Sequence, residues 1–220
     1  MSESRAGGAG AGPRLPIARE GWPFIAVPLV AAGILALLGR RRAAALVALP
    51  GLASVGFFRD PERRVPAVPG AVLAPADGRV MGVARVEDRW VGDATRVSIF
   101  LSPLDVHVNR APIAAIVRRV EHMPGRFLAA YRPEASEDNE RCTLDLEGEA
   151  MRVSVRQIAG VVARRIVCRA RPGDKLAAGE RYGLIRFGSR TDLVVPRAAE
   201  LRVDVGDRVT GGESIMAVLG

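Results

Sequence analysis

The sequence predicts an α+β fold that is rich in β-structure, in which an apolar helical hairpin precedes a compact domain of short strands. Two uncharged stretches near the amino terminus, residues 21–39 and 43–58, are long enough to form helices. After residue 70, short apolar runs recur between Gly, Pro and Asp residues, which is typical of strands joined by tight turns. Long amphipathic helices and alternating strand and helix periodicity do not appear there. We therefore expect a β-rich domain whose carboxyl part is a small sandwich or barrel.

The amino-terminal third divides into a segment that we expect to be disordered, residues 1–20, and a membrane-associated helical hairpin, residues 21–58. The first segment begins with a run rich in Gly, Ala and Ser. Both apolar stretches lack the amphipathic stripe of helices that pack on a soluble domain. A cleaved signal peptide is the alternative for the first stretch, but a second apolar stretch follows it at once.

The depth of this hairpin in a membrane stays open. A helix needs about 20 residues to cross about 30 Å of hydrocarbon, and the two stretches have 19 and 16. Residues 40–42, all arginine, would form the tip, and moving three guanidinium groups across a bilayer is unfavourable. Because further arginines flank the hairpin, the distribution of basic residues places both of its ends on the cytoplasmic side.

A proline-rich, charged linker, residues 59–69, separates the hairpin from the β-rich domain, residues 70–220. In residues 151–158, Val153 and Val155 alternate with polar side chains, as in a strand with one buried face. The runs expected to form strands are 78–86, 96–101, 113–120, 151–158, 183–187, 192–195 and 201–205.

The composition excludes several classes of function. The net charge is +8, but residues 1–64 carry +5 of it, so the excess charge belongs to the membrane segment and does not indicate a nucleic-acid partner. Lys175 is the only lysine among 32 basic residues, which leaves one position for chemistry that needs a lysine amine. Two cysteines and two histidines are too few for a disulfide framework, and they give no metal-binding pattern.

Three segments hold residues that are candidates for chemistry. Ser189 is the only serine that follows a glycine, Gly188, and we expect a loop between two strands to present it. His107 and Arg110 follow an apolar run, at a strand end or in a loop. Asp77 lies in an Asp-Gly turn. Spacing alone does not join these segments, and for His107 and Asp77 a purely structural role is the alternative.

Taken together, the segments resemble phosphatidylserine decarboxylase proenzymes, particularly the short bacterial form. The resemblance runs over nearly all of residues 15–220, and the Gly-Ser segment is its most specific part. The segments that carry it are APADGRV (74–80), SPLDVHVNRAP (102–112), ASEDNER (135–141), RQIAGVVARRIV (156–167) and GERYGLIRFGSRTDLVVP (179–196).

The resemblance implies that the chain cuts itself between Gly188 and Ser189, giving a β chain of residues 1–188 and an α chain of residues 189–220. Ser189 would become a pyruvoyl group, the cofactor with which phosphatidylserine is decarboxylated to phosphatidylethanolamine. His107 would act in self-cleavage, in decarboxylation or in both, and Asp77 matches an acid needed for maturation. Longer relatives have a second histidine where this chain has Arg110, which we regard as a weaker candidate for binding substrate.

The resemblance also implies the bacterial inner membrane as the location and membrane lipid as a partner. Whether the chain forms a homo-oligomer stays open. The alternative from another class is a membrane-anchored β-sandwich without enzymatic activity, such as a secretion-adaptor or carrier-like domain.

Overall fold

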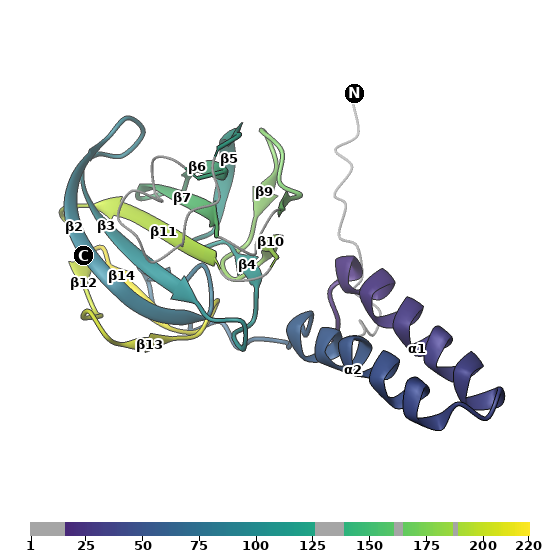
Figure 1. Cartoon of the computed structure of the whole chain (residues 1–220). Coiled ribbons are helices and arrows are strands. Elements are labelled where there is room, and N and C mark those ends of the chain that lie inside the picture. The colour runs from purple at the N-terminus through teal and green to yellow at the C-terminus, as the bar shows by residue number, and fades with distance from the viewer. Residues whose placement is uncertain (1–15, 126–138, 161–164, 187–188) are drawn as a thin grey trace.

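The computed structural model describes residues 16–125, 139–160, 165–186 and 189–220, and it begins with the expected hairpin (Figure 1). A short 3-10 turn, Arg19–Gly21, leads into helix α1 (Trp22–Leu37), and helix α2 (Arg41–Phe57) returns beside it. Gly39 joins the two helices with φ of 76°, a left-handed conformation that glycine adopts without steric cost. The helical hairpin predicted for residues 21–58 is therefore confirmed.

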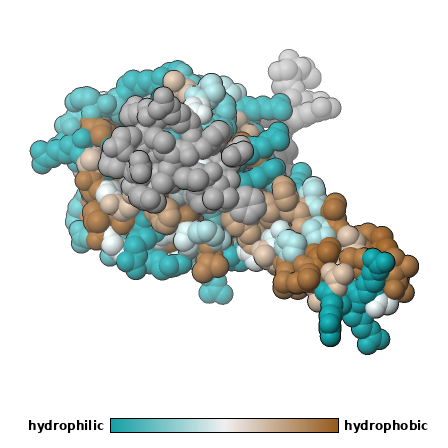
Figure 2. All heavy atoms as spheres, in the orientation of Figure 1, coloured by the Kyte–Doolittle hydropathy of each residue, from teal (hydrophilic) through white to brown (hydrophobic). Residues whose placement is uncertain are grey.

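The hairpin exposes its apolar side chains. Val27, Ile34 and Leu46 are 69%, 54% and 69% exposed, and Figure 2 shows a hydrophobic surface along the hairpin with hydrophilic atoms at its far end. Among the described residues, one helical segment, Arg19–Leu37, is long and apolar enough to cross a membrane, with a mean hydropathy of 1.7. Such a surface is unusual for a soluble protein and indicates an apolar environment around these helices.

The remainder of the described chain is built from short strands. They are β1 (Ala71–Leu73), β2 (Gly78–Asp88), β3 (Gly92–Leu101), β4 (Val108–Arg110), β5 (Ala115–Met123), β6 (Arg141–Glu147), β7 (Arg152–Ala159), β8 (Ile166–Cys168), β9 (Lys175–Leu176), β10 (Arg181–Ile185), β11 (Ser189–Pro196), β12 (Glu200–Leu201), β13 (Arg208–Val209) and β14 (Ile215–Val218). Each expected run contains at least part of one of these strands, so the β-rich domain is confirmed.

Eight strands form one curled antiparallel sheet in the order β13-β2-β3-β11-β7-β6-β5-β9 (Figure 1). Two three-stranded sheets, β4-β10-β8 and β1-β14-β12, complete the domain. Apolar side chains from all three sheets fill one core, which includes Ile99, Leu144 and Leu193. Strand β11 lies near the middle of the large sheet and pairs with β3 on one side and β7 on the other.

A second, smaller core joins the hairpin to the β-rich domain. Phe57 and Phe58, at the end of α2, are buried with Val106, Val108 and Leu184. The two phenylalanine rings meet edge to face, with centroids 5.0 Å apart. The base of the hairpin is therefore part of the folded domain, whereas its far end projects away from it (Figure 1).

Two expectations need correction. Ser189 is the first residue of β11 and pairs with Leu101 and Ala159, so no loop presents it. The apolar run that follows extends the strand back to Ser189 because both neighbouring strands offer it pairing partners. The amino terminus was expected to be disordered as far as residue 20, but Ile17 bridges to Arg59 in an antiparallel arrangement. Residues 1–15 lie outside the described residues.

Candidate active site

Ser189 lies at the end of the most enclosed strand of the domain. It has no exposed surface, and its Oγ has no hydrogen-bond partner among the described residues. Since a buried hydroxyl without a partner is costly, this atom is a candidate for a reacting group. Gly188, the residue before it, lies outside the described residues.

His107 is also fully buried, and the structure fixes its tautomer. Its Nδ1 lies 2.9 Å from the backbone oxygen of Asp105. Because a carbonyl oxygen can only accept a hydrogen bond, Nδ1 carries the proton and Nε2 presents a lone pair. Nε2 is buried and has no partner within the described part of the chain. A neutral imidazole with a free basic nitrogen is the arrangement that a general base requires.

Burial lowers the pKa of His107 from 6.5 to about 4. The loss of hydration is the main cause, and the hydrogen bond to the Asp105 backbone and the nearby carboxylate of Asp105 oppose it. The ring of Phe57 contributes to this enclosure, since its centroid is 4.2 Å from that of the imidazole. His107 is therefore neutral, and able to accept a proton, at ordinary pH.

Hydrogen bonds link the segment that holds His107 to strands β10 and β11. Asn109 Nδ2 donates to Thr191 Oγ1 at 3.1 Å, and His107 and Ser189 lie two residues earlier in the respective segments. The backbone N–H of Ile185 donates to the carbonyl of His107 at 3.2 Å, and Ile185 is only four residues before Ser189. The segments that hold His107 and Ser189 are thus connected through the Asn109–Thr191 hydrogen bond, and a direct contact between the two residues stays a prediction.

Asp77 lies close to this region but does not bond to the histidine. Its Oδ1 accepts the backbone N–H of Gly211 at 2.8 Å, and its Oδ2 accepts Arg63 Nη2 at 2.7 Å. Burial raises the pKa of Asp77, and the two hydrogen bonds and the charge of Arg63 limit the rise. Asp77 therefore joins the linker, the 74–77 turn and the carboxyl part of the chain.

Arg110 has structural partners for its guanidinium group. It donates to the carbonyl oxygens of Gly179 at 3.0 Å and Pro61 at 2.8 Å, and to Asp60 Oδ1 at 3.2 Å. Arg181 donates to the same carboxylate of Asp60 at 2.7 Å. Burial and the neighbouring Arg181 lower the pKa of Arg110. These contacts fasten the linker to the domain, and substrate binding by Arg110 stays a prediction.

Sequence reasoning missed a buried polar network beside Ser189. It comprises Asn109, Gln157 and Thr191, none of which has any exposed surface. Gln157 Nε2 donates to Asn109 Oδ1 at 2.8 Å. A signal for Gln157 was present in the sequence, because Gln157 continues the alternating series of Val153 and Val155 and so occupies a position that faces the core.

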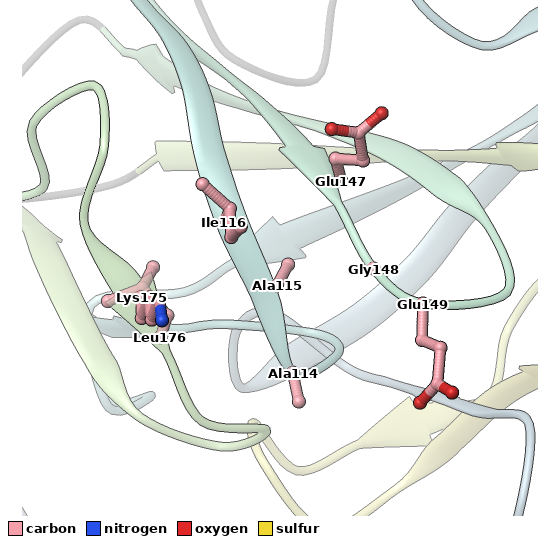
Figure 3. A pocket seen from close by; sticks show the side chains of 8 residues that line it. All are labelled: Ala114, Ala115, Ile116, Glu147, Gly148, Glu149, Lys175 and Leu176. Atoms are coloured by element: carbon pink, nitrogen blue, oxygen red, sulfur yellow. The ribbon is translucent and has the colours of Figure 1, made fainter.

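One cavity lies away from these residues. It measures about 600 Å³, and Figure 3 shows Lys175 on one side of it with Glu147 and Glu149 on the other. Lys175 is exposed at the edge strand β9, and none of the predicted site residues lines this cavity. Within the described ranges, no three His, Cys, Asp or Glu side chains form a group suited to a metal ion.

Comparison with known proteins links this site to a chemistry. The family model described as phosphatidylserine decarboxylase matches residues 52–217. A protein of Symbiobacterium thermophilum named phosphatidylserine decarboxylase proenzyme is 49% identical over 206 residues, covering 92% of this chain and 95% of that protein. A protein of the same name from Nitrosomonas europaea is 45% identical over 207 residues, covering 91% and 94%.

Proposed function

The chain belongs to the phosphatidylserine decarboxylase proenzyme family, and from that premise we propose that it makes its own pyruvoyl group by cleavage at Ser189, with His107 as the base. As a member of this family it is a carboxy-lyase of phospholipid biosynthesis. The non-enzymatic alternative considered from the sequence is therefore set aside. The observation that carries the proposal is the pair of buried, unpartnered atoms, Ser189 Oγ and His107 Nε2.

Self-cleavage needs a proton acceptor beside the serine hydroxyl. In the proposed reaction His107 Nε2 takes the Oγ proton while Oγ attacks the carbonyl carbon of Gly188. The C–N bond to Ser189 breaks, the proton passes to that nitrogen, and an ester replaces the amide. Removal of the Cα proton of residue 189 then expels the carboxylate of Gly188 and leaves dehydroalanine, which water converts to a pyruvoyl group and ammonia. Each step uses groups that the chain itself supplies, together with water.

The residues around Ser189 fit a pyruvoyl group at that position. The site is buried, its hydroxyl is not held by any described residue, and the neutral His107 lies in a segment linked to β11 through the Asn109–Thr191 hydrogen bond. Such a group supplies a carbonyl that accepts the electron pair left when carbon dioxide departs. After cleavage, His107 Nε2 would return a proton to the substrate carbon, which is a second use for the same atom.

The strand pairing explains how two chains would stay together after cleavage. Residues 189–220 contribute β11, β12, β13 and β14. Strand β11 lies between β3 and β7, β13 pairs with β2, and β14 pairs with β1. Since these partners all precede residue 188, the α chain is held by three separate regions of the β chain without a peptide bond.

We propose the cytoplasmic face of the bacterial inner membrane as the location. The family is membrane-associated, and the apolar hairpin, joined to the site through Phe57, supports a position at the bilayer surface. Trp22, 41% exposed at the base of the hairpin, lies where interfacial aromatic residues are common. It lines a cavity of about 410 Å³ with Arg19, Asp60 and two paired arginines, Arg169 (with Glu20) and Arg181 (with Asp60). The charge of Arg19 suits an anionic lipid head group.

Denaturing mass spectrometry of the purified protein tests the proposal. We expect two chains, residues 1–188 and 189–220, with a pyruvoyl group at the start of the smaller one and carbon dioxide release from phosphatidylserine. Ser189→Ala should give one intact chain and no carbon dioxide. Ser154→Ala, which alters an equally buried serine on the adjacent strand β7, is the control and should cleave normally. An intact wild-type chain that retains residue 189 as serine would contradict the proposal.

A further inference from the structure

The buried network beside Ser189 has one fixed orientation. Asn109 Nδ2 donates to Thr191 Oγ1 at 3.1 Å and approaches the carbonyl oxygen of Pro75 at 3.4 Å. Because the Pro75 oxygen can only accept, the amide nitrogen of Asn109 faces it and Asn109 Oδ1 faces Gln157. Gln157 Nε2 must then be the donor to Asn109 Oδ1, at 2.8 Å. The side-chain amide of Gln157 is held in one of its two orientations.

This orientation leaves the other end of the Gln157 amide without a partner. Gln157 has no exposed surface, and its Oε1 accepts no hydrogen bond from any described residue. Leaving a buried acceptor unpaired is unfavourable. Because Gln157 Oε1 is buried, fixed and unpaired, it is a candidate to accept a hydrogen bond from a ligand.

Gln157 lies on the same face of the large sheet as Ser189. Gln157 on β7 is paired with Thr191 on β11, so the two side chains share a face of the sheet. Ser189 is two residues before Thr191 and lies on that same face. Diagonal neighbours across antiparallel strands are within reach of long side chains. Gln157 and Ser189 are such neighbours, and each has an unpartnered buried oxygen.

We propose that Gln157 Oε1 binds the amino group of the serine head group and presents it to residue 189, with Asn109 as the residue that positions the amide. The inference rests on the proposed function, since it takes residue 189 as the reaction centre. The head group carries one group rich in N–H donors and two anionic groups, and a carbonyl oxygen attracts only the former. A neutral acceptor also orients the amine without the strong rise in its pKa that a carboxylate would cause.

Binding of two short-chain lipids to the processed enzyme tests this inference. Dioctanoyl phosphatidylethanolamine and dioctanoyl phosphatidylpropanol have head groups of the same shape, but the second has a methyl group where the first has its amine. We expect the wild type to prefer the amine by at least 10-fold in Kd. In Gln157→Met, a similar side chain without the acceptor, this preference should fall by at least 10-fold while the chain still cleaves itself. An unchanged preference in that variant would overturn the inference.

Controls separate this inference from its premise. Tyr182→Phe removes another buried hydroxyl that has no partner in the described structure, and it should keep the wild-type preference. If Gln157→Met does not fold, Gln157→Glu takes its place: a carboxylate should strengthen the preference for the amine and move the pH optimum of decarboxylation upward. If Gln157→Glu changes neither the preference for the amine nor the pH optimum of decarboxylation, the inference is also overturned. A wild type that fails to cleave would instead refute the proposed function.

Discussion

The hairpin and the β-rich domain solve the same problem, the burial of apolar side chains, in opposite ways. The domain buries its apolar residues against one another, and Leu144, Ile158 and Leu193 are fully enclosed. The hairpin presents Leu37 and Leu46 to its surroundings, 90% and 69% exposed. The domain therefore carries its own apolar interior, whereas the hairpin needs one from outside, which a lipid bilayer supplies.

The two regions also treat polar groups differently. The domain encloses several of them, including the Arg190–Asp192 ion pair at 2.6 Å and the site residues His107 and Ser189. The hairpin carries arginines at its tip, where the structure leaves them exposed. The regions meet at Phe57, which belongs to helix α2 and packs on His107. This difference agrees with the proposal that the domain carries the reaction and the hairpin attaches it to the membrane.

The largest expected effect is on the rate of self-cleavage, and it comes from a substitution in the β-rich domain that does not alter the hairpin. His107→Gln keeps a polar side chain of similar length but removes the base, and we expect self-cleavage to slow by at least 100-fold. The measurement is the fraction of intact chain over time on denaturing gels.

His122→Gln is the matched control. His122 is half exposed on β5, where its Nε2 lies 3.2 Å from Glu140 Oε1, and its replacement should change the rate less than 2-fold. Normal cleavage in His107→Gln would confine His107 to the lipid reaction or to a structural role.

A change at the junction should affect both regions. Phe57→Ala opens a cavity in the small core beside His107 and should lower the free energy of unfolding by about 3–4 kcal/mol. Urea unfolding in detergent, in the uncleavable Ser189→Ala background, measures it. Leu52→Ala is the control, because Leu52 lies on the same helix and is 58% exposed; its effect should stay within about 0.5 kcal/mol. If Phe57→Ala and Leu52→Ala lower the free energy of unfolding equally, the small core between the hairpin and the domain does not contribute to stability.

The buried histidine should make the domain sensitive to acid. The folded-state pKa of His107 is lowered to about 4, against 6.5 for the unfolded chain. As the pH falls from 6.5 to about 4, the unfolded chain takes up a proton that the folded chain does not. The free energy of unfolding therefore falls, by about 3 kcal/mol at most.

Comparison with His107→Gln isolates this contribution, since other titrating groups such as Asp77 are common to both proteins. We expect the difference in unfolding free energy between the two proteins to change between pH 6.5 and 4 and to be constant above pH 7. A constant difference across the whole range would show that His107 is not buried in solution.

The smallest effect on folding is expected in the hairpin itself. Replacing Val27, Ile34 and Leu46 together by serine should change the free energy of unfolding of the domain by less than about 0.5 kcal/mol, because these side chains pack on nothing in the domain. Binding to phospholipid vesicles should fall by at least 10-fold, since each side chain contributes about 1.5–3 kcal/mol when transferred into an apolar medium.

Val83→Ser, at a half-exposed position on β2, is the control for vesicle binding and should have no effect. If the hairpin variant unfolds much more easily while its vesicle binding is unchanged, the comparison between the regions is wrong.

Much of the fold could be predicted because its signals are local. Two uncharged apolar stretches on either side of the arginines at 40–42 predict the hairpin, and alternation at Val153 and Val155 predicts a strand. Strands such as β4, β9 and β13 were missed because two or three residues carry no periodic pattern. Their conformation is imposed by partners distant in the sequence, such as Arg208 opposite Arg79.

The sequence by itself determined the family, the hairpin and the identity of Ser189 and His107 as candidates, because residue order and composition encode these directly. The tertiary structure was needed to show that Ser189 begins a buried strand, that Arg110 holds the linker, and that Gln157 shares a face of the sheet with Ser189. These properties depend on which strands lie side by side. Burial and hydrogen-bond geometry arise from such pairings, so they have no signature in any single segment of the chain.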